Sequence, residues 1–151
     1  MPKRTRIGQP GTVISGTLRN EDLIPEFIRE LRCMVPLHRA DRKLIREVEF
    51  AMKSPDYWGS EAASEDCNSL MDALSNYAPY GCYFGATVGD GADFGFWLPE
   101  YFQQEFDGLQ VSDTSEIPTG YTGEVLHVND HGNATIYACN RGRLRELAAY
   151  V

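Results

Sequence analysis

The spacing of apolar residues changes near the middle of the chain. Before about residue 78, apolar residues recur every three or four positions, as they do on one face of a helix. This spacing predicts a helix from residue 20 to about 33, with its apolar face formed by Leu23, Ile24, Phe27, Ile28 and Leu31. It predicts two more helices, over 39–53 and about 60–77, each followed by a proline that a helix interior would not accept.

The second half instead has short aromatic or β-branched runs separated by Gly, Asp and Asn, which is typical of strands and tight turns. Strands are predicted near 82–87, 93–98, 122–128 and 134–139, with a hairpin turn at 129–132, a short helix over 99–106 and a last strand from about 143. Helices first and strands later favour an α+β fold. We expect an antiparallel sheet of four to five strands with about three helices packed on one face.

Length favours one compact domain, since 151 residues is near the common domain size. Residues 1–19 contain four basic side chains, no acid and several Gly and Pro, so we expect a flexible basic arm before a single domain over 20–151. No run approaches the roughly 20 apolar residues of a membrane span, and the basic start lacks the apolar core of a secretory signal. A cytoplasmic location without membrane association is therefore expected.

Charge is segregated along the sequence. Residues 1–53 hold eleven Lys or Arg and seven Asp or Glu, whereas residues 54–140 hold fourteen acids and no Lys or Arg. Two interpretations follow: either the basic helices neutralise the acidic sheet, or the acids form a surface that attracts a basic partner. The second interpretation predicts a non-enzymatic binding protein with no catalytic residue and no cofactor. Its partner-binding residues would be Asp90, Asp93, Trp97, Glu100, Tyr101, Glu105, Asp107, Asp113 and Glu116.

The aromatic segment 83–97 reads as a hairpin around a Gly-Asp-Gly turn. Its second strand would place Phe94 and Phe96 on one face and Asp93, Gly95 and Trp97 on the other. Two acids alone are few for a Ca²⁺ or Mg²⁺ loop, and the glycines lack the Lys-Ser or Lys-Thr of a phosphate-binding loop.

Two alternatives stay open. The first is a small metal- or nucleotide-dependent enzyme or ligand-binding protein, with its site at the 85–97 hairpin together with His127, Asp130 and His131. The second is a homodimer in which the basic helices of one subunit meet the acidic sheet of the other.

Two segments, Gly16–Pro25 and Tyr83–Trp97, resemble parts of uncharacterised small proteins encoded by bacteriophages and other mobile elements. The likeness covers roughly residues 12–100. Small acidic proteins of such elements often inhibit host defence machinery, so the resemblance implies an inhibitor of a defence nuclease in the cytoplasm of a bacterial host. It would act by nucleic-acid mimicry or by occluding a basic groove. Direct contact with nucleic acid is expected only weakly, through the basic arm.

Overall fold

The computed structural model describes residues 5–150, and the chain divides into two compact units, Met1–Glu100 and Tyr101–Val151. Each unit contains its own cluster of buried apolar side chains, whereas the sequence predicted a single domain over 20–151. The α+β class is confirmed, with the strands divided between two sheets. Among residues 5–150, no helix has the length and apolar character that crossing a membrane requires.

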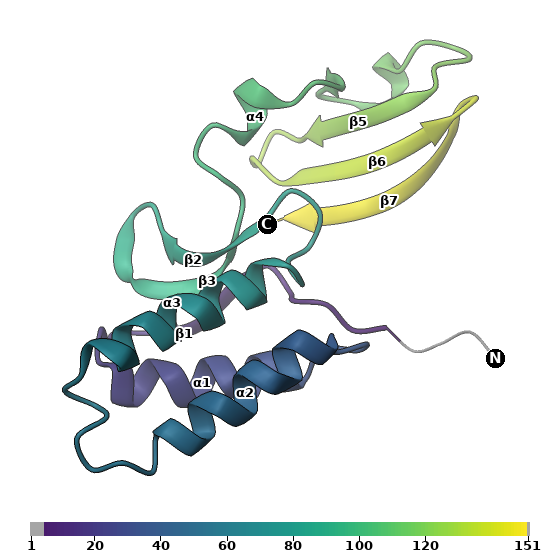
Figure 1. Ribbon diagram of the computed structural model, residues 1–151. Coiled ribbons are helices and arrows are strands. Elements are labelled where there is room, and N and C mark those ends of the chain that lie inside the picture. Colours follow the sequence, from purple (N-terminus) through teal and green to yellow (C-terminus); the bar gives the residue numbers. More distant parts are fainter. Residues whose placement is uncertain (1–4, 151) are drawn as a thin grey trace. The chain divides into compact units, whose positions relative to one another are not determined.

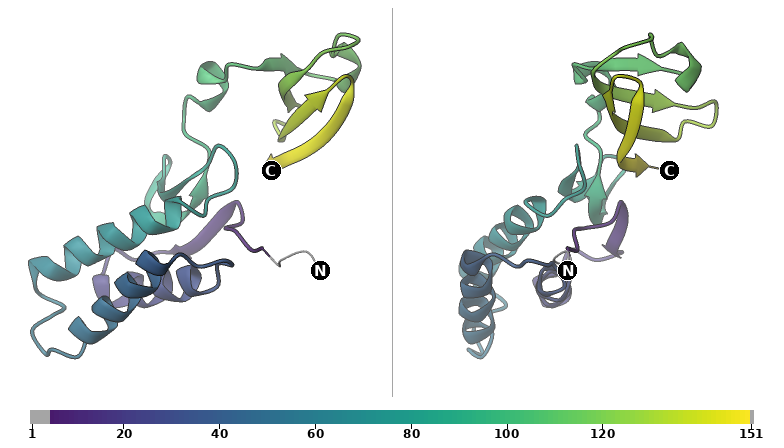
Figure 2. Two further views of the ribbon diagram at one scale, coloured as in Figure 1. Left: turned by 45° about the vertical axis from the view of Figure 1, so that its right-hand side comes forward. Right: turned by 90° about the vertical axis from the view of Figure 1, so that its right-hand side faces the viewer.

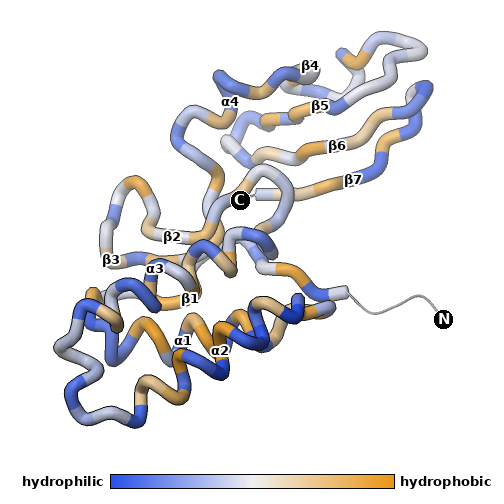
Figure 3. Tube along the Cα trace, in the orientation of Figure 1, coloured by the Kyte–Doolittle hydropathy of each residue, from blue (hydrophilic) through white to orange (hydrophobic). Residues whose placement is uncertain are grey.

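The first unit contains the three predicted helices, α1 (Asn20–Arg32), α2 (Arg39–Ala51) and α3 (Glu61–Ser75). Helix α1 tolerates Pro25 because the residue lies in the first two turns and its ring is exposed. Helix α3 begins where Ser60 accepts a hydrogen bond from the Ala63 N–H, which is the usual capping arrangement. Apolar and polar stretches alternate along these helices, as helices with one buried face require (Figure 3).

The sheet of the first unit has the order β1-β3-β2 and is antiparallel, with β1 (Gly11–Ser15), β2 (Tyr83–Thr87) and β3 (Asp90–Trp97). Helices α1 and α3 pack against one face of it (Figures 1 and 2). Phe84, Phe94 and Phe96 point into this interface, where the Phe27 ring of α1 lies 5.1 Å from Phe84 and 5.6 Å from Phe94. Helices packed on one face of a sheet were predicted, and this is confirmed.

The predicted flexible arm is wrong for its central part. Gly11–Ser15 forms β1, which pairs with β3, and the backbone of Arg6 exchanges hydrogen bonds with Val35. No strand was predicted here because Gly, Pro and a short apolar run are typical of a loop, and the pairing partner lies some eighty residues later. Lys3 and Arg4 of the arm lie outside the described residues.

The second unit is built on a sheet of order β4-β5-β6-β7. Its strands are β4 (Leu109–Val111), β5 (Gly123–Val128), β6 (Ala134–Asn140) and β7 (Arg143–Tyr150), and α4 (Phe102–Glu105) precedes them. Strand β4 runs parallel to β5, and the other pairs are antiparallel. Val111, Val125 and Cys139 form a buried cluster in this unit.

The predicted hairpin turn between β5 and β6 is confirmed. The side-chain oxygen of Asn129 accepts hydrogen bonds from the backbone N–H groups of His131 and Asn133. Gly132 has φ 80°, a value that glycine adopts without strain. The chain then reverses again at Arg141-Gly142, so the last predicted strand is also present as β7.

The close approach of β1 and β3 gives a test of the sheet. A Cβ added to Gly95 would lie 2.0 Å from the carbonyl oxygen of Gly11, so we expect Gly95→Ala to lower the free energy of unfolding by about 2 kcal/mol or more. Gly91 lies in the same strand, and a Cβ there would meet nothing within 4 Å. Urea denaturation of Gly95→Ala and Gly91→Ala compares them, and equal stabilities of the two variants would contradict the β1–β3 pairing.

Candidate functional site

Three of the predicted partner-binding residues lie on β3. Asp93 and Trp97 are on the sheet face opposite Phe94 and Phe96, as the alternation predicted. Asp93 accepts a hydrogen bond of 2.8 Å from the Thr12 hydroxyl of β1, and the Trp97 indole N–H donates one of 3.0 Å to the Gly85 carbonyl of β2. Both side chains therefore stabilise the pairing of the three strands as well as facing outward.

On the outer face of this sheet, two neighbouring glycines leave the backbone without side chains. Gly85 and Gly95 are directly opposite each other in the β2–β3 ladder. The Tyr83 ring lies against Gly85, because a Cβ on Gly85 would be 3.3 Å from Cε2 of Tyr83. The Tyr83 hydroxyl donates to the Ala86 carbonyl, and burial raises its pKa above the ordinary value of 10.0. Tyr83 and Trp97 thus cover part of the backbone that the glycines leave bare.

Asp90 occupies the exposed end of the hairpin beside Val88, which is 63% exposed. One carboxylate oxygen of Asp90 accepts the Ala92 N–H at 2.9 Å and stabilises the turn. Its other oxygen has no protein donor among the described residues. The turn therefore presents a negative charge and an apolar side chain together.

The second unit has its own acidic group in the loop that follows β4, at Asp113 and Glu116. Asp113 accepts the Ser115 N–H at 2.9 Å, and Glu116 accepts the Ser112 hydroxyl at 2.7 Å. His127 of β5 reaches the same loop, where Nε2 lies 3.1 Å from the Ser112 carbonyl oxygen. The hydrogen bond from Ser115 and the nearby His127 hold the pKa of Asp113 below its usual value, so this exposed carboxylate is ionised at neutral pH.

The segment between these two places contributes four more of the predicted residues. Glu100 ends the first unit, and Tyr101, Glu105 and Asp107 belong to the second. All four are exposed, and the Tyr101 side chain is 60% exposed although it is aromatic. The predicted residues are therefore divided between the two units, whereas the sequence treated them as one group.

The ion pairs within each unit show whether these acids have cationic partners there. Ion pairs among residues 5–150 include Arg19–Glu21, Arg29–Glu26, Arg32–Glu49 and Lys43–Glu47, all within the basic front of the chain. Within its own unit, none of the seven acids in the predicted partner-binding set has a described Lys or Arg at ion-pair distance. Within the described part of each unit, the negative charge of these acids is therefore not cancelled by a direct ion pair.

The alternative enzyme site is not assembled within either unit. Asp90 and Asp93 belong to the first unit, whereas His127, Asp130 and His131 belong to the second. His127 contacts the Ser112 carbonyl, and the His131 backbone closes the β5–β6 turn. Within residues 5–150, no group of three or more His, Cys, Asp or Glu side chains is placed to hold a metal ion.

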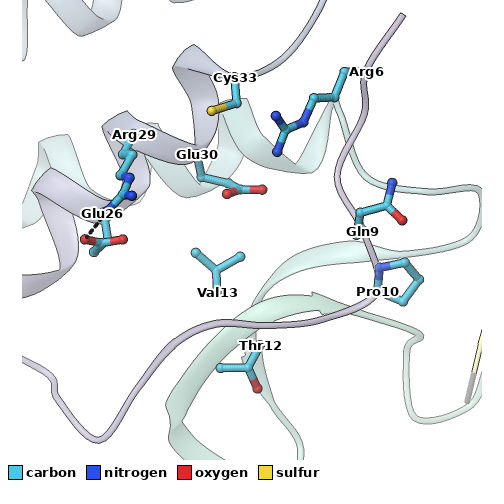
Figure 4. A pocket seen from close by; sticks show the side chains of 9 residues that line it. All are labelled: Arg6, Gln9, Pro10, Thr12, Val13, Glu26, Arg29, Glu30 and Cys33. Atoms are coloured by element: carbon cyan, nitrogen blue, oxygen red, sulfur yellow. Dashed lines mark ion pairs between the residues drawn. The ribbon is translucent and has the colours of Figure 1, made fainter.

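A groove between β1 and α1 is a feature that the sequence did not predict. Its volume is about 530 Å³, and Val13 of the edge strand β1 forms part of its floor. Glu30 from α1 and Arg6 from the N-terminal segment point into it from different walls, and Arg29 lies 3.7 Å from Glu26 at its rim (Figure 4). Two cations and two anions balance, so the groove suits a ligand with both charges better than a polyanion. Predicting this groove from the sequence would have required predicting the strand at residues 11–15, which lines part of it.

No protein-family model matches this chain, and neither a curated protein nor a solved structure matches it.

The hydrogen bonds around Asp113 predict its titration. We expect its carboxyl group to titrate below the ordinary value of 3.8, because the Ser115 N–H and the positive charge of His127 favour the carboxylate. A carboxyl whose pKa is lower in the folded state stabilises the fold above the unfolded pKa, and this contribution is lost as the pH falls through the folded value. Carbon-detected NMR of the side chain measures the titration, with Asp113→Asn to assign the signal. A midpoint at or above 3.8 would show that these contacts are absent in solution.

Proposed function

We propose that this protein is a non-enzymatic binding protein that attaches through its acidic surfaces to a basic partner. The observation that carries the proposal is the absence, within each unit and among the described residues, of a Lys or Arg partner for Asp90, Asp93, Glu100, Glu105, Asp107, Asp113 and Glu116. Exposed carboxylates without counter-charges create a negative potential that attracts a positively charged protein and accelerates association.

A partner that handles nucleic acid fits this charge best. Grooves that bind nucleic acid are lined with Lys and Arg and attract phosphates largely through charge. Carboxylates interspersed with exposed rings, such as Tyr101 between Glu100 and Glu105, offer such a groove both negative charge and an apolar contact. The protein would then occupy the groove in place of nucleic acid.

The host context comes from the resemblance of residues 12–100 to small proteins of bacteriophages and mobile elements. An element that enters a bacterium meets nucleases that must bind its nucleic acid, and an acidic protein in excess would block that binding. We therefore propose a host defence nuclease as the partner. This step rests on the resemblance and on the charge together.

The exposed acids on either side of β4 are the best place to test the proposal. Asp107→Asn, Asp113→Asn and Glu116→Gln together remove three exposed charges and keep oxygen acceptors for the Ser115 and Ser112 hydrogen bonds. Wild type and variant are immobilised and exposed to a nuclease-treated bacterial lysate at about 50 mM salt. We expect wild type to retain nucleic-acid-binding proteins that added duplex DNA displaces. We expect the triple variant to retain about tenfold less of the same proteins.

The matched control removes the same number of charges elsewhere. Glu61→Gln, Glu65→Gln and Asp72→Asn neutralise three exposed acids of α3 that lie outside the predicted set. This control should retain the partners nearly as wild type does. Equal losses from both triple variants, or retention that does not fall at about 300 mM salt, would overturn the proposal. Binding through the charges of one particular surface must weaken when those charges are removed and when salt screens them.

A further inference from the structure

The exposed face of α2 carries a row of positively charged side chains, opposite in sign to the acidic surfaces described above. Arg39, Arg42, Arg46 and Phe50 are spaced by three, four and four residues, which places them on one side of a helix over about 16 Å. All four side chains are exposed, and the buried residues of the helix, Ile45 and Val48, lie on the other side. Helix α2 packs against α1 and α3 through that buried side.

The acids near this stripe are already engaged. Glu49 pairs with Arg32 of α1, and Glu47 lies 3.7 Å from Lys43. Asp41 accepts a hydrogen bond from the Tyr77 hydroxyl on the packed side of the helix. Within residues 5–150, Arg39, Arg42 and Arg46 therefore have no carboxylate partner, and their positive charge faces solvent.

A shallow groove of about 240 Å³ runs beside the stripe. Arg32, Arg42 and Arg46 line it, and Leu37 and Ile45 supply an apolar floor. Guanidinium groups bind phosphate through paired hydrogen bonds and also stack on planar rings. The groove thus offers both kinds of contact to a ligand that alternates phosphates with flat apolar groups.

Phe50 is the second observation that identifies the ligand. Its side chain is 75% exposed, and the Lys53 ammonium nitrogen lies 5.8 Å from the ring centroid. An exposed ring at the end of a row of cations is the arrangement with which proteins hold single strands, because bases stack on the ring while cations follow the phosphates. A duplex keeps its bases stacked internally and would use the arginines alone.

We propose that the face of α2 formed by Arg39, Arg42, Arg46 and Phe50 is a binding site for single-stranded nucleic acid. The overall charge of −8 opposes this binding, so the complex is weak, with a dissociation constant on the order of 10⁻⁵ M at moderate salt. The site uses residues that the acidic surfaces do not, and neither proposal depends on the other.

The test is fluorescence anisotropy of a labelled thymidine 20-mer with the full-length protein at salt concentrations from about 20 to 200 mM. We expect the wild-type affinity to fall steeply with salt. Arg42→Gln/Arg46→Gln should reduce the slope of log affinity against log salt by about 1.4, since each phosphate contact with a single strand contributes about 0.7. Phe50→Ala should weaken binding about tenfold at every salt concentration and leave the slope unchanged, because stacking is not electrostatic.

The control is Arg143→Gln/Arg145→Gln, which removes two exposed arginines from β7 and should leave binding unchanged. Circular dichroism and thermal melting establish that each variant is folded, and the single Arg42→Gln and Arg46→Gln variants replace the double variant if it is not. Three results would overturn the proposal: no binding at about 20 mM salt, an equal loss from the β7 control, or wild-type affinity in Phe50→Ala. Polyglutamate that binds as tightly, with the same dependence on Arg42 and Arg46, would instead assign the stripe to an acidic protein.

Discussion

The contact of the Phe27 ring with Phe84 and Phe94 is the interaction on which the first unit depends. Phe27 is fully buried and meets both rings edge to face, at centroid distances of 5.1 and 5.6 Å. Because side chains alternate along a strand, fixing Phe94 toward α1 necessarily turns Asp93 and Gly95 outward. The polar face of the sheet is therefore a consequence of the aromatic packing on its other side.

The same packing separates the charges of the first unit. Helices α1 and α3 cover the inner face of the sheet, and α2 packs on those helices rather than mainly on the strands. The arginines of α2 consequently occupy a different face from Asp93 and Asp90. Within the described part of the first unit, the arginines of α2 therefore form no ion pair with Asp90 or Asp93.

Much of the architecture was predictable from local patterns. The three helices follow from apolar spacing, and the β5–β6 turn follows from Asn129 and Gly132, since these signals reside in adjacent residues. β1 was not predictable, because Thr12 and Ile14 become a strand only by pairing with β3. The parallel strand β4 has three residues and was missed for the same reason.

The sequence suggested which residues could form the candidate site, but it did not show where they lie in the fold. The sequence left open whether the acids are neutralised or exposed, and it could not place Glu100 and Glu105 in different units. It also gave no indication that the Trp97 indole and the Asp93 carboxylate would be engaged by the neighbouring strands. Hydrogen bonds of this kind depend on strand register, which a single sequence does not specify.

The facing glycines Gly85 and Gly95 constrain which other proteins can share the aromatic segment 83–97. Gly95 has no room for a side chain beside Gly11, Gly85 underlies the Tyr83 ring, and Phe94 and Phe96 fill the interior. A search for other proteins with this run of glycines and rings would therefore select for a shared backbone. Such proteins would be expected to differ in the residues outside this segment, such as those of α2 and of the loop after β4, if they bind different partners.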